Sequence, residues 1–331
     1  MSYKDSRRAI LIIIGIAGML ISGLALSLWR PWHIDPERPV RVGYLPIYVD
    51  LPFFVAVEEG MLKDAKVNVE PIPFQSSPDM GAALISGKID AVASIATSSA
   101  LALETRDPGK FQIFLVDAET PEAYLSSLVV PKDSEVKSVD DLRDKTIGSF
   151  PGPTAKLFGP LALKRLGLAR SDYKIVELPI GSHNAALNTG RIDAVITYEP
   201  TATQAVLKYG SRKFVPGLIE ANVISPWQAG IWIVSSRYAR KSPAKAQAFV
   251  RAIYRAVDLI REDPQRAKGC LRNFTSIEIE IARETPNIPF TKVWEADLVT
   301  LQRHADLLTK EGVLSKAVDI PQLMMVVKAT Q

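Results

Sequence analysis

The sequence predicts an α/β fold of two similar lobes that follows an N-terminal transmembrane helix. Three observations support this prediction: an uncharged apolar run near the N-terminus, an alternation of strand-like and helix-like segments from Val40 onward, and a short segment that recurs about a hundred residues later. The 331 residues are 47% hydrophobic and 23% charged, which is typical of globular proteins and sufficient for two domains.

The first element is the apolar run from Ala9 to Trp29, in which no side chain is charged. As a helix it would be about 31 Å long, close to the thickness of the hydrocarbon core of a membrane. Arg7 and Arg8 precede it, and the positive-inside rule then places the N-terminus in the cytoplasm. We therefore expect a cytoplasmic stub at 1–8, a transmembrane signal-anchor helix at 9–29 and an extended linker at 30–39.

Alternatives to an uncleaved anchor stay open. The segment "SRRAIL", from Ser6 to Leu11, resembles a twin-arginine export signal, so the export route is either general or twin-arginine. A cleaved signal peptide is also an alternative, although the run is long and the nearest Ala-x-Ala-like site, at 25–27, is a poor one. The sole cysteine is Cys270, which excludes a lipid-bearing cysteine after the run. We expect the body at the periplasmic face of the cell membrane.

The formal net charge of +4 and the pI of about 9.0 do not indicate a nucleic-acid partner. Lys4, Arg7, Arg8 and Arg30 against Asp5 contribute +3, which leaves +1 for the rest of the chain. The basic character therefore belongs to the N-terminal segment and not to a binding face.

The body then alternates between strands and helices, which favours parallel βαβ units. In the first half, the expected strands are 40–46, 65–74 and 88–94, and the expected helices are 52–62 and 78–86. In the second half, the expected strands are 124–134, 145–150, 173–179 and 191–197, the helices are 153–167 and 182–190, a capping box starts a short helix at 138–142, and a return strand covers 228–236.

The recurring segment reads "ISGKIDAVAS" at 85–94 and "NTGRIDAVIT" at 188–197. Each copy passes from a helix end through a glycine turn into a strand, and the interval is too long for a solenoid repeat. We therefore expect two lobes, the first made of 40–131 plus 228–331 and the second of 132–227. Ligands of open α/β sheets bind at the carboxyl ends of strands, so the cleft between the lobes is the expected site.

Longer stretches carry a family resemblance. The segments "VRVGYLPIYVDLPFFVAVEEGMLKD", "ALISGKIDAVAS", "LVVPKDSEVKSVDDLRDKTIG" and "GRIDAVITYEPTATQA" together resemble the nitrate/sulfonate/taurine-type solute-binding proteins of ABC importers, over roughly 40–268. The resemblance implies a bilobal periplasmic-binding-protein fold of type II, with two α/β lobes joined by a two-strand hinge.

The resemblance also implies which positions form the ligand cleft. The "FPGPTAK" loop leads a helix whose free N–H groups attract an anion, although a plain βα loop is the alternative. Glu199 would face an amine or ring N–H of the ligand, or else would cap the helix at 200–208. The aromatic side chains would enclose an apolar part of the ligand. The expected ligand-binding residues are Tyr44, Tyr48, Phe53, Gln75, Ser76, Ser94, Thr97, Gly152, Thr154, Ala155, His183, Tyr198, Glu199 and Trp227.

The expected function is the capture of a small organic ion by lobe closure and its delivery to the permease and ATPase subunits of an ABC importer. A taurine-like or other aliphatic sulfonate, or a nitrogen-containing compound, would suit the site, whereas nitrate alone would leave Glu199 and the aromatic residues without a role. We expect a monomer with no catalytic residues, metal or cofactor. Two alternatives are a membrane-tethered sensor and an enzyme of the same fold related to thiamine-pyrimidine synthesis. One cysteine and three histidines count against the enzyme.

Overall fold

The computed structural model describes residues 38–327, without the side chain of Ala155. The expected stub, the apolar run and nearly all of the linker lie outside the described residues. Within residues 38–327, no helix combines the length and apolarity that a membrane crossing needs. The described residues from Pro39 onward belong to one unit.

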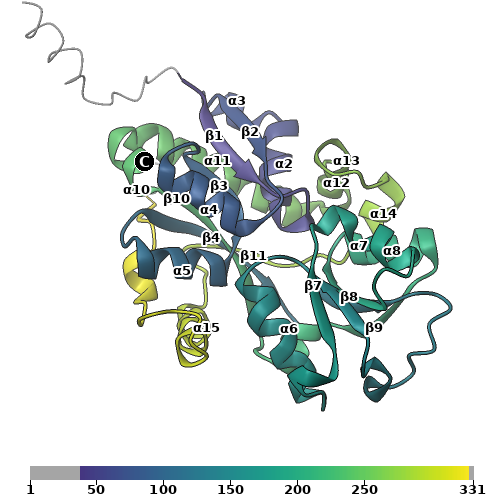
Figure 1. Ribbon diagram of the computed structural model, residues 1–331. Coiled ribbons are helices and arrows are strands. Elements are labelled where there is room, and N and C mark those ends of the chain that lie inside the picture. The colour runs from purple at the N-terminus through teal and green to yellow at the C-terminus, as the bar shows by residue number, and fades with distance from the viewer. Residues whose placement is uncertain (1–37, 328–331) are drawn as a thin grey trace, which may run out of the picture. The chain divides into compact units, whose positions relative to one another are not determined.

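Two β-sheets organise this unit (Figure 1). The first sheet has six strands in the order β11-β4-β10-β3-β1-β2. β1 is parallel to β2 and β3, whereas β10 is antiparallel to β3 and β4. The bounds are β1 Val40–Tyr44, β2 Val69–Pro73, β3 Ala91–Ala96, β4 Phe111–Glu119, β10 Trp227–Ser235 and β11 Phe290–Lys292.

Helices cover the first sheet, and the longest of them is amphipathic. The apolar residues of α11 face inward, with Phe249, Ile253 and Val257 fully buried. We refer to the first sheet and its helices as the first lobe. Its helices are α2 Leu51–Glu58, α3 Met61–Asp64, α4 Ser77–Ser86, α5 Thr97–Arg106, α10 Ser236–Lys241, α11 Pro243–Glu262 and α15 Leu298–Lys310.

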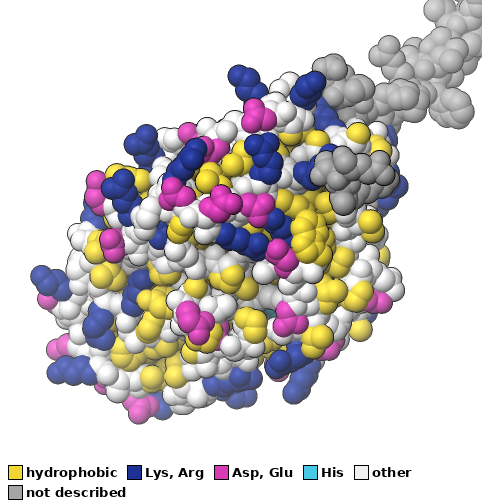
Figure 2. Space-filling view, turned by 180° about the vertical axis from the view of Figure 1, so that it is seen from behind, with side chains coloured by type: hydrophobic (Ala, Val, Ile, Leu, Met, Phe, Trp, Pro, Cys, Tyr) yellow, Lys and Arg dark blue, Asp and Glu magenta, His cyan; other side chains and the backbone are white. Residues whose placement is uncertain are grey.

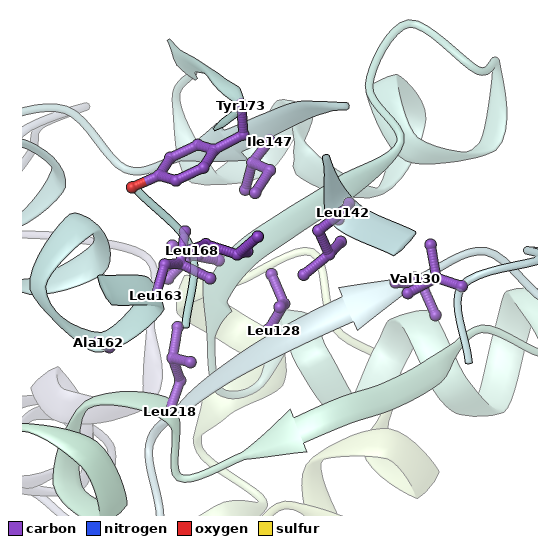
Figure 3. Close-up of a cluster of buried hydrophobic side chains, with 12 residues drawn as sticks. Leu128, Val130, Leu142, Ile147, Ala162, Leu163, Leu168, Tyr173 and Leu218 are labelled. Carbon is purple, nitrogen blue, oxygen red and sulfur yellow. The ribbon is translucent and has the colours of Figure 1, made fainter. Parts of the chain in front are cut away.

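The second sheet has five strands in the order β7-β6-β8-β5-β9. Its strands are β5 Ser126–Val130, β6 Thr146–Ser149, β7 Lys174–Glu177, β8 Ala194–Tyr198 and β9 Arg212–Pro216. Four helices accompany it: α6 Pro153–Arg165, α7 His183–Asn188, α8 Thr201–Tyr209 and α9 Leu218–Asn222. Leu128, Ile147 and Leu163 from β5, β6 and α6 meet in the buried cluster of Figure 3. We refer to this sheet and its helices as the second lobe.

Three short helices follow α11: α12 Pro264–Lys268, α13 Leu271–Phe274 and α14 Ile279–Glu284. They return the chain toward the second lobe, where Lys208 of α8 forms an ion pair with Glu278 at 2.7 Å. On the face in Figure 2, acidic and basic side chains are interspersed with apolar ones. This mixture agrees with the small charge that remains once the N-terminal segment is excluded.

The two recurring segments occupy equivalent positions in different sheets, as their sequences predict. One runs from α4 into β3, and the other runs from α7 into β8. In each copy the aspartate accepts a backbone N–H from the neighbouring parallel strand: Asp90 from Arg41 at 3.1 Å, and Asp193 from Thr146 at 2.8 Å. These carboxylates therefore hold the start of the strand in register.

The chain changes sheet in two places, between β4 and β5 and between β9 and β10. The first change lies within residues 120–125, which is earlier than the expected boundary at 131. All of β5 pairs with β8 or β9 in the second sheet, and its side chains are buried. The return strand β10 begins at Trp227, one residue before the expected boundary.

Candidate functional site

A cavity lies between the two lobes. Its walls come from the carboxyl ends of β1, β3 and β8, from the segments that cross between the sheets, and from the first turns of α4 and α6. Of the described residues that line it, Asp117 alone has an acidic or basic side chain. The lining residues are Leu45, Ile47, Val49, Ser77, Ser94, Ala96, Asp117, Leu125, Phe150, Thr154, Tyr198, Trp227, Ala229 and Gly230.

Polar groups cross the first-lobe wall of the cavity from β4 to β3. Asp117 of β4 accepts a hydrogen bond from the Ser94 hydroxyl of β3 at 2.8 Å, and its carboxylate lies over Gly230 of the intervening strand β10. A Cβ atom at Gly230 would lie 2.4 Å from Ser94 Oγ and 2.5 Å from Asp117 Oδ2. The glycine is therefore required for the Ser94–Asp117 bond.

Two buried carboxyl groups lie close together at this wall. Burial raises the pKa of Asp117 to about 7, although the hydrogen bond from Ser94 opposes the rise. Burial also raises the pKa of Asp50 well above its usual value, and the nearby Asp117 raises it further. Asp50 accepts the Leu45 N–H at 2.6 Å. In both carboxyls, Oδ1 is buried without a hydrogen-bond partner among the described atoms.

Another part of the cavity wall is aromatic. The rings of Tyr198 and Trp227 lie 6.3 Å apart at 33°, and Phe150 meets Tyr198 edge-on at 6.2 Å. Burial raises the pKa of the Tyr198 hydroxyl, so this ring is neutral at ordinary pH. These rings provide an apolar surface for the body of a small molecule.

Hydrogen bonds join the two lobes beside the cavity. The hydroxyls of Ser98 on α5 and Thr154 on α6 are 3.1 Å apart, and both residues are buried. The Tyr48 N–H donates to the Glu199 carbonyl oxygen at 3.2 Å. The cleft is therefore closed in this structure.

Four of the expected ligand-binding residues line the cavity: Ser94, Thr154, Tyr198 and Trp227. Gly152 precedes α6 with a φ of 118°, a conformation that favours glycine, and Thr154 is in the first turn of this helix. The side chain of Ala155 lies outside the described part of the chain.

The expected residues of the first lobe other than Ser94 and Trp227 are not among those that line the cavity. Tyr44 and Phe53 belong to an aromatic cluster with Phe54 and Phe274. Tyr48 is buried and stacks on Phe290. Gln75 is exposed. Ser76 caps α4 by accepting the Asp79 N–H, and the Thr97 hydroxyl donates to the Gln228 carbonyl oxygen at 2.8 Å.

His183 is part of the second-lobe interior and does not line the cavity, contrary to our expectation. Its Nε2 is 3.0 Å from the Leu178 carbonyl oxygen, so Nε2 carries the proton and Nδ1 accepts from the Thr197 hydroxyl at 2.9 Å. Burial lowers the pKa of His183 to about 4, which keeps the ring neutral. Both ring nitrogens are therefore used within the protein.

Glu199 also differs from the expectation that it faces a ligand. Its side chain is fully buried, Oε1 accepts from Lys213 Nζ at 2.6 Å, and Oε2 accepts the Thr203 N–H at 3.0 Å. The second bond satisfies a free N–H group in the first turn of α8, as in the capping alternative. The carboxylate therefore supplies no argument for an amine on the ligand.

Sequence reasoning missed Asp117, although a signal was present. The segment "FQIFLVDAE" is an apolar strand interrupted by an acid, and a buried acid in a central strand is rare without a partner or a role. Among residues 38–327, no group of three or more His, Cys, Asp or Glu side chains is placed to hold a metal ion.

Known proteins share both the sequence pattern and the fold. The chain is 26% identical over 318 residues, covering 94% of this chain and 95% of its relative, to the Escherichia coli K12 protein named "Putative aliphatic sulfonates-binding protein". The alkanesulfonate-binding protein of Xanthomonas axonopodis pv. citri, solved with MOPS bound, has a TM-score of 0.71 at 20% identity, over 87% of this chain and 98% of that chain.

An enzyme is also among the relatives. The 4-amino-5-hydroxymethyl-2-methylpyrimidine phosphate synthase of Saccharomyces cerevisiae is 22% identical over 236 residues, covering 68% of this chain and 67% of that protein. The structural similarity shows a periplasmic-binding-protein-like α/β fold with two sheets. Residues 48–267 match the model of the family described as "NMT1/THI5 like", which is more than half of the chain. The chain therefore belongs to the NMT1/THI5-like family, and it is similar to proteins named as sulfonate-binding.

Proposed function

We propose that this protein is an extracytoplasmic solute-binding protein that closes its two lobes over a small organic solute and delivers it to an ABC importer. The observation that carries the proposal is the cavity between the lobes, with side chains from both sheets in its wall and hydrogen bonds between the lobes beside it. A solute that contacts both walls favours the closed form over the open one.

The site suits a small solute with an apolar body. Aromatic and aliphatic side chains dominate its wall, and the first turn of α6 reaches it at Thr154. An aliphatic sulfonate, a taurine-like aminosulfonate or a nitrogen-containing compound agrees with this environment. The names of the sulfonate-binding relatives support the same class.

Anchoring by the apolar run at 9–29 is part of the proposal. It would hold the binding lobes at the periplasmic face of the membrane, where a monomer could meet the importer. The thiamine-pyrimidine alternative relies on an active-site histidine and a cysteine-rich segment. His183 and His304 are both buried outside the cavity lining, so neither supports that chemistry here.

Calorimetry on the purified protein tests the proposal. A panel of aliphatic sulfonates, amino acids, pyrimidines and nitrate is titrated, and we expect one organic class to bind at micromolar or better affinity. Thr154→Val removes the hydroxyl that bonds to Ser98 across the lobes, so affinity should fall about three- to tenfold. Thr105→Val is the control, since that hydroxyl bonds within α5 to Ala102. Absence of binding to every organic class would contradict the function.

A further inference from the structure

We propose that the cavity selects solutes with an amino group, whose N–H donates to Oδ1 of Asp117, and that Asp117 is the residue that determines this specificity. This inference rests on the proposed solute-binding function. Among sulfonates it predicts that the protein prefers aminosulfonates to plain alkanesulfonates.

The hydrogen bonding of the Asp117 carboxylate favours a donor on the ligand. Asp117 is fully buried and lines the cavity, and Ser94 donates to its Oδ2. Oδ1 makes no close hydrogen bond among the described atoms, while the Trp232 indole N–H and the Gly230 N–H lie near the carboxylate. Since buried polar atoms in folded proteins are normally bonded, a donor on a molecule in the cavity would complete the hydrogen bonding of this oxygen.

The charges of the side chains at the cavity wall also favour an amino group. Of the described residues that line the cavity, none is a lysine, arginine or histidine, and Asp50 adds a second carboxyl group close to Asp117. Lys213 of the second lobe, which is partly buried, is already paired with Glu199. An anionic group beside Asp117 would therefore be repelled, whereas an ammonium group or a neutral N–H would be favoured.

The two lobes offer different environments to the two ends of a ligand. Asp117 is on the first lobe, and Thr154, in the first turn of the 13-residue helix α6, is on the second. The helix dipole favours negative charge at that end. A short molecule with an amine at Asp117 and an acidic group toward α6 would contact both lobes and so favour closure.

Matched pairs of solutes test the inference by calorimetry on the full chain. Taurine and ethanesulfonate share the sulfonate and the two-carbon chain and differ in the amino group; 4-aminopyrimidine and pyrimidine differ in the same way. We expect the amino member of at least one pair to bind ten- to a hundredfold more tightly, the range for a hydrogen bond to a charged group. Asp117→Asn should reduce this preference to less than about threefold.

The control is Asp193→Asn, because that carboxylate accepts a strand N–H outside the cavity lining, and its preference should be unchanged. Equal binding of both members of every pair that binds would overturn the inference and leave solute binding intact. A preference that survives in Asp117→Asn would overturn the assignment to Asp117. Failure of all four compounds to bind would overturn the inference, whereas the proposed function is contradicted only if no organic class of the wider panel binds.

If the Asp117→Asn variant does not fold, the pH dependence of binding to the wild-type protein tests the inference instead. The wild-type preference is measured at pH 5 and pH 8, where the amino group of taurine stays protonated. Asp50 and Asp117 are the carboxyl groups at this wall, with Ser94, Trp232 and the Gly230 N–H as their polar neighbours. Protonation of the wall at pH 5 should reduce the preference for taurine at least fivefold, and a preference that does not change with pH would overturn the inference.

Discussion

The Glu199 carboxylate is held from two sides, by Lys213 of β9 and by the first turn of α8. In the sequence the Glu-Pro pair is equally compatible with ligand binding and with capping of a helix. The choice depends on Lys213, which is 14 residues away and reaches the carboxylate only because β8 and β9 flank β5 in one sheet. A cation at that position turns the side chain into an internal ion pair.

Glu199→Gln should therefore destabilise the empty protein and leave ligand affinity nearly unchanged. The variant loses a charge-assisted hydrogen bond and leaves Lys213 mostly buried without its partner, at a cost of roughly 2–3 kcal/mol in the free energy of unfolding. Denaturant unfolding measures this cost. Lys213→Met should give a similar loss, and the double variant should lose much less than the sum of both. A loss of affinity at unchanged stability would contradict this role.

At the scale of the element, β10 links the hydrogen bonding of the first sheet to the cavity. It pairs with β3 on one side and with β4 on the other, and its register shifts on both sides of Gly230 and Ile231. The first four residues of the strand include Trp227, Ala229 and Gly230, all of which line the cavity. The strand therefore contributes to the ligand surface and to the sheet core at once.

Gly230→Ala should lower stability by about 1–3 kcal/mol, because the new methyl group overlaps both Ser94 and Asp117. It should also weaken amine binding, since relief of the overlap moves the Asp117 carboxylate. Gly181→Ala is the matched control: no atom lies within 4 Å of the added methyl group, and we expect a change within about 0.5 kcal/mol. Equal stability of the two variants in thermal unfolding would show that the strand accommodates a side chain at Gly230.

At the scale of the whole molecule, the two sheets are separate hydrogen-bonded units that share one chain passing between them twice. Direct hydrogen bonds join the lobes beside the cavity, among them the buried side-chain pairs Ser98–Thr154 and Glu119–Ser126. Such an arrangement permits one lobe to move relative to the other while each keeps its own core. This is the physical basis of the proposed closure.

The proposed anchor makes a prediction for the complete protein. Full-length protein should stay in the membrane fraction after carbonate washing, because the run at 9–29 is apolar enough to span a membrane. Residues from Asp35 onward should be accessible to protease added outside the cytoplasmic membrane. A soluble periplasmic protein trimmed near residues 25–27 would contradict the anchor and support a cleaved signal.

The sequence by itself determined the alternation of strands and helices, the two equivalent "G-basic-IDAV" segments and the family. These features are local: apolar periodicity, glycine turns and the strand-starting aspartates depend on residues close together in the chain. Four residues of the cavity wall, Ser94, Thr154, Tyr198 and Trp227, could also be predicted from the sequence, because they lie at or near the ends of strands or begin a helix.

The tertiary structure alone decided which polar side chains remain available to a ligand. His183 and Glu199 are satisfied by Leu178, Thr197 and Lys213, whereas Asp117 keeps an oxygen without a partner at the cavity. Ser94 is 23 residues from Asp117 in sequence, and Gly230 is more than a hundred residues beyond Asp117. Whether a carboxylate is paired inside the protein or faces a cavity depends on burial and on such distant neighbours, and local sequence patterns contain neither.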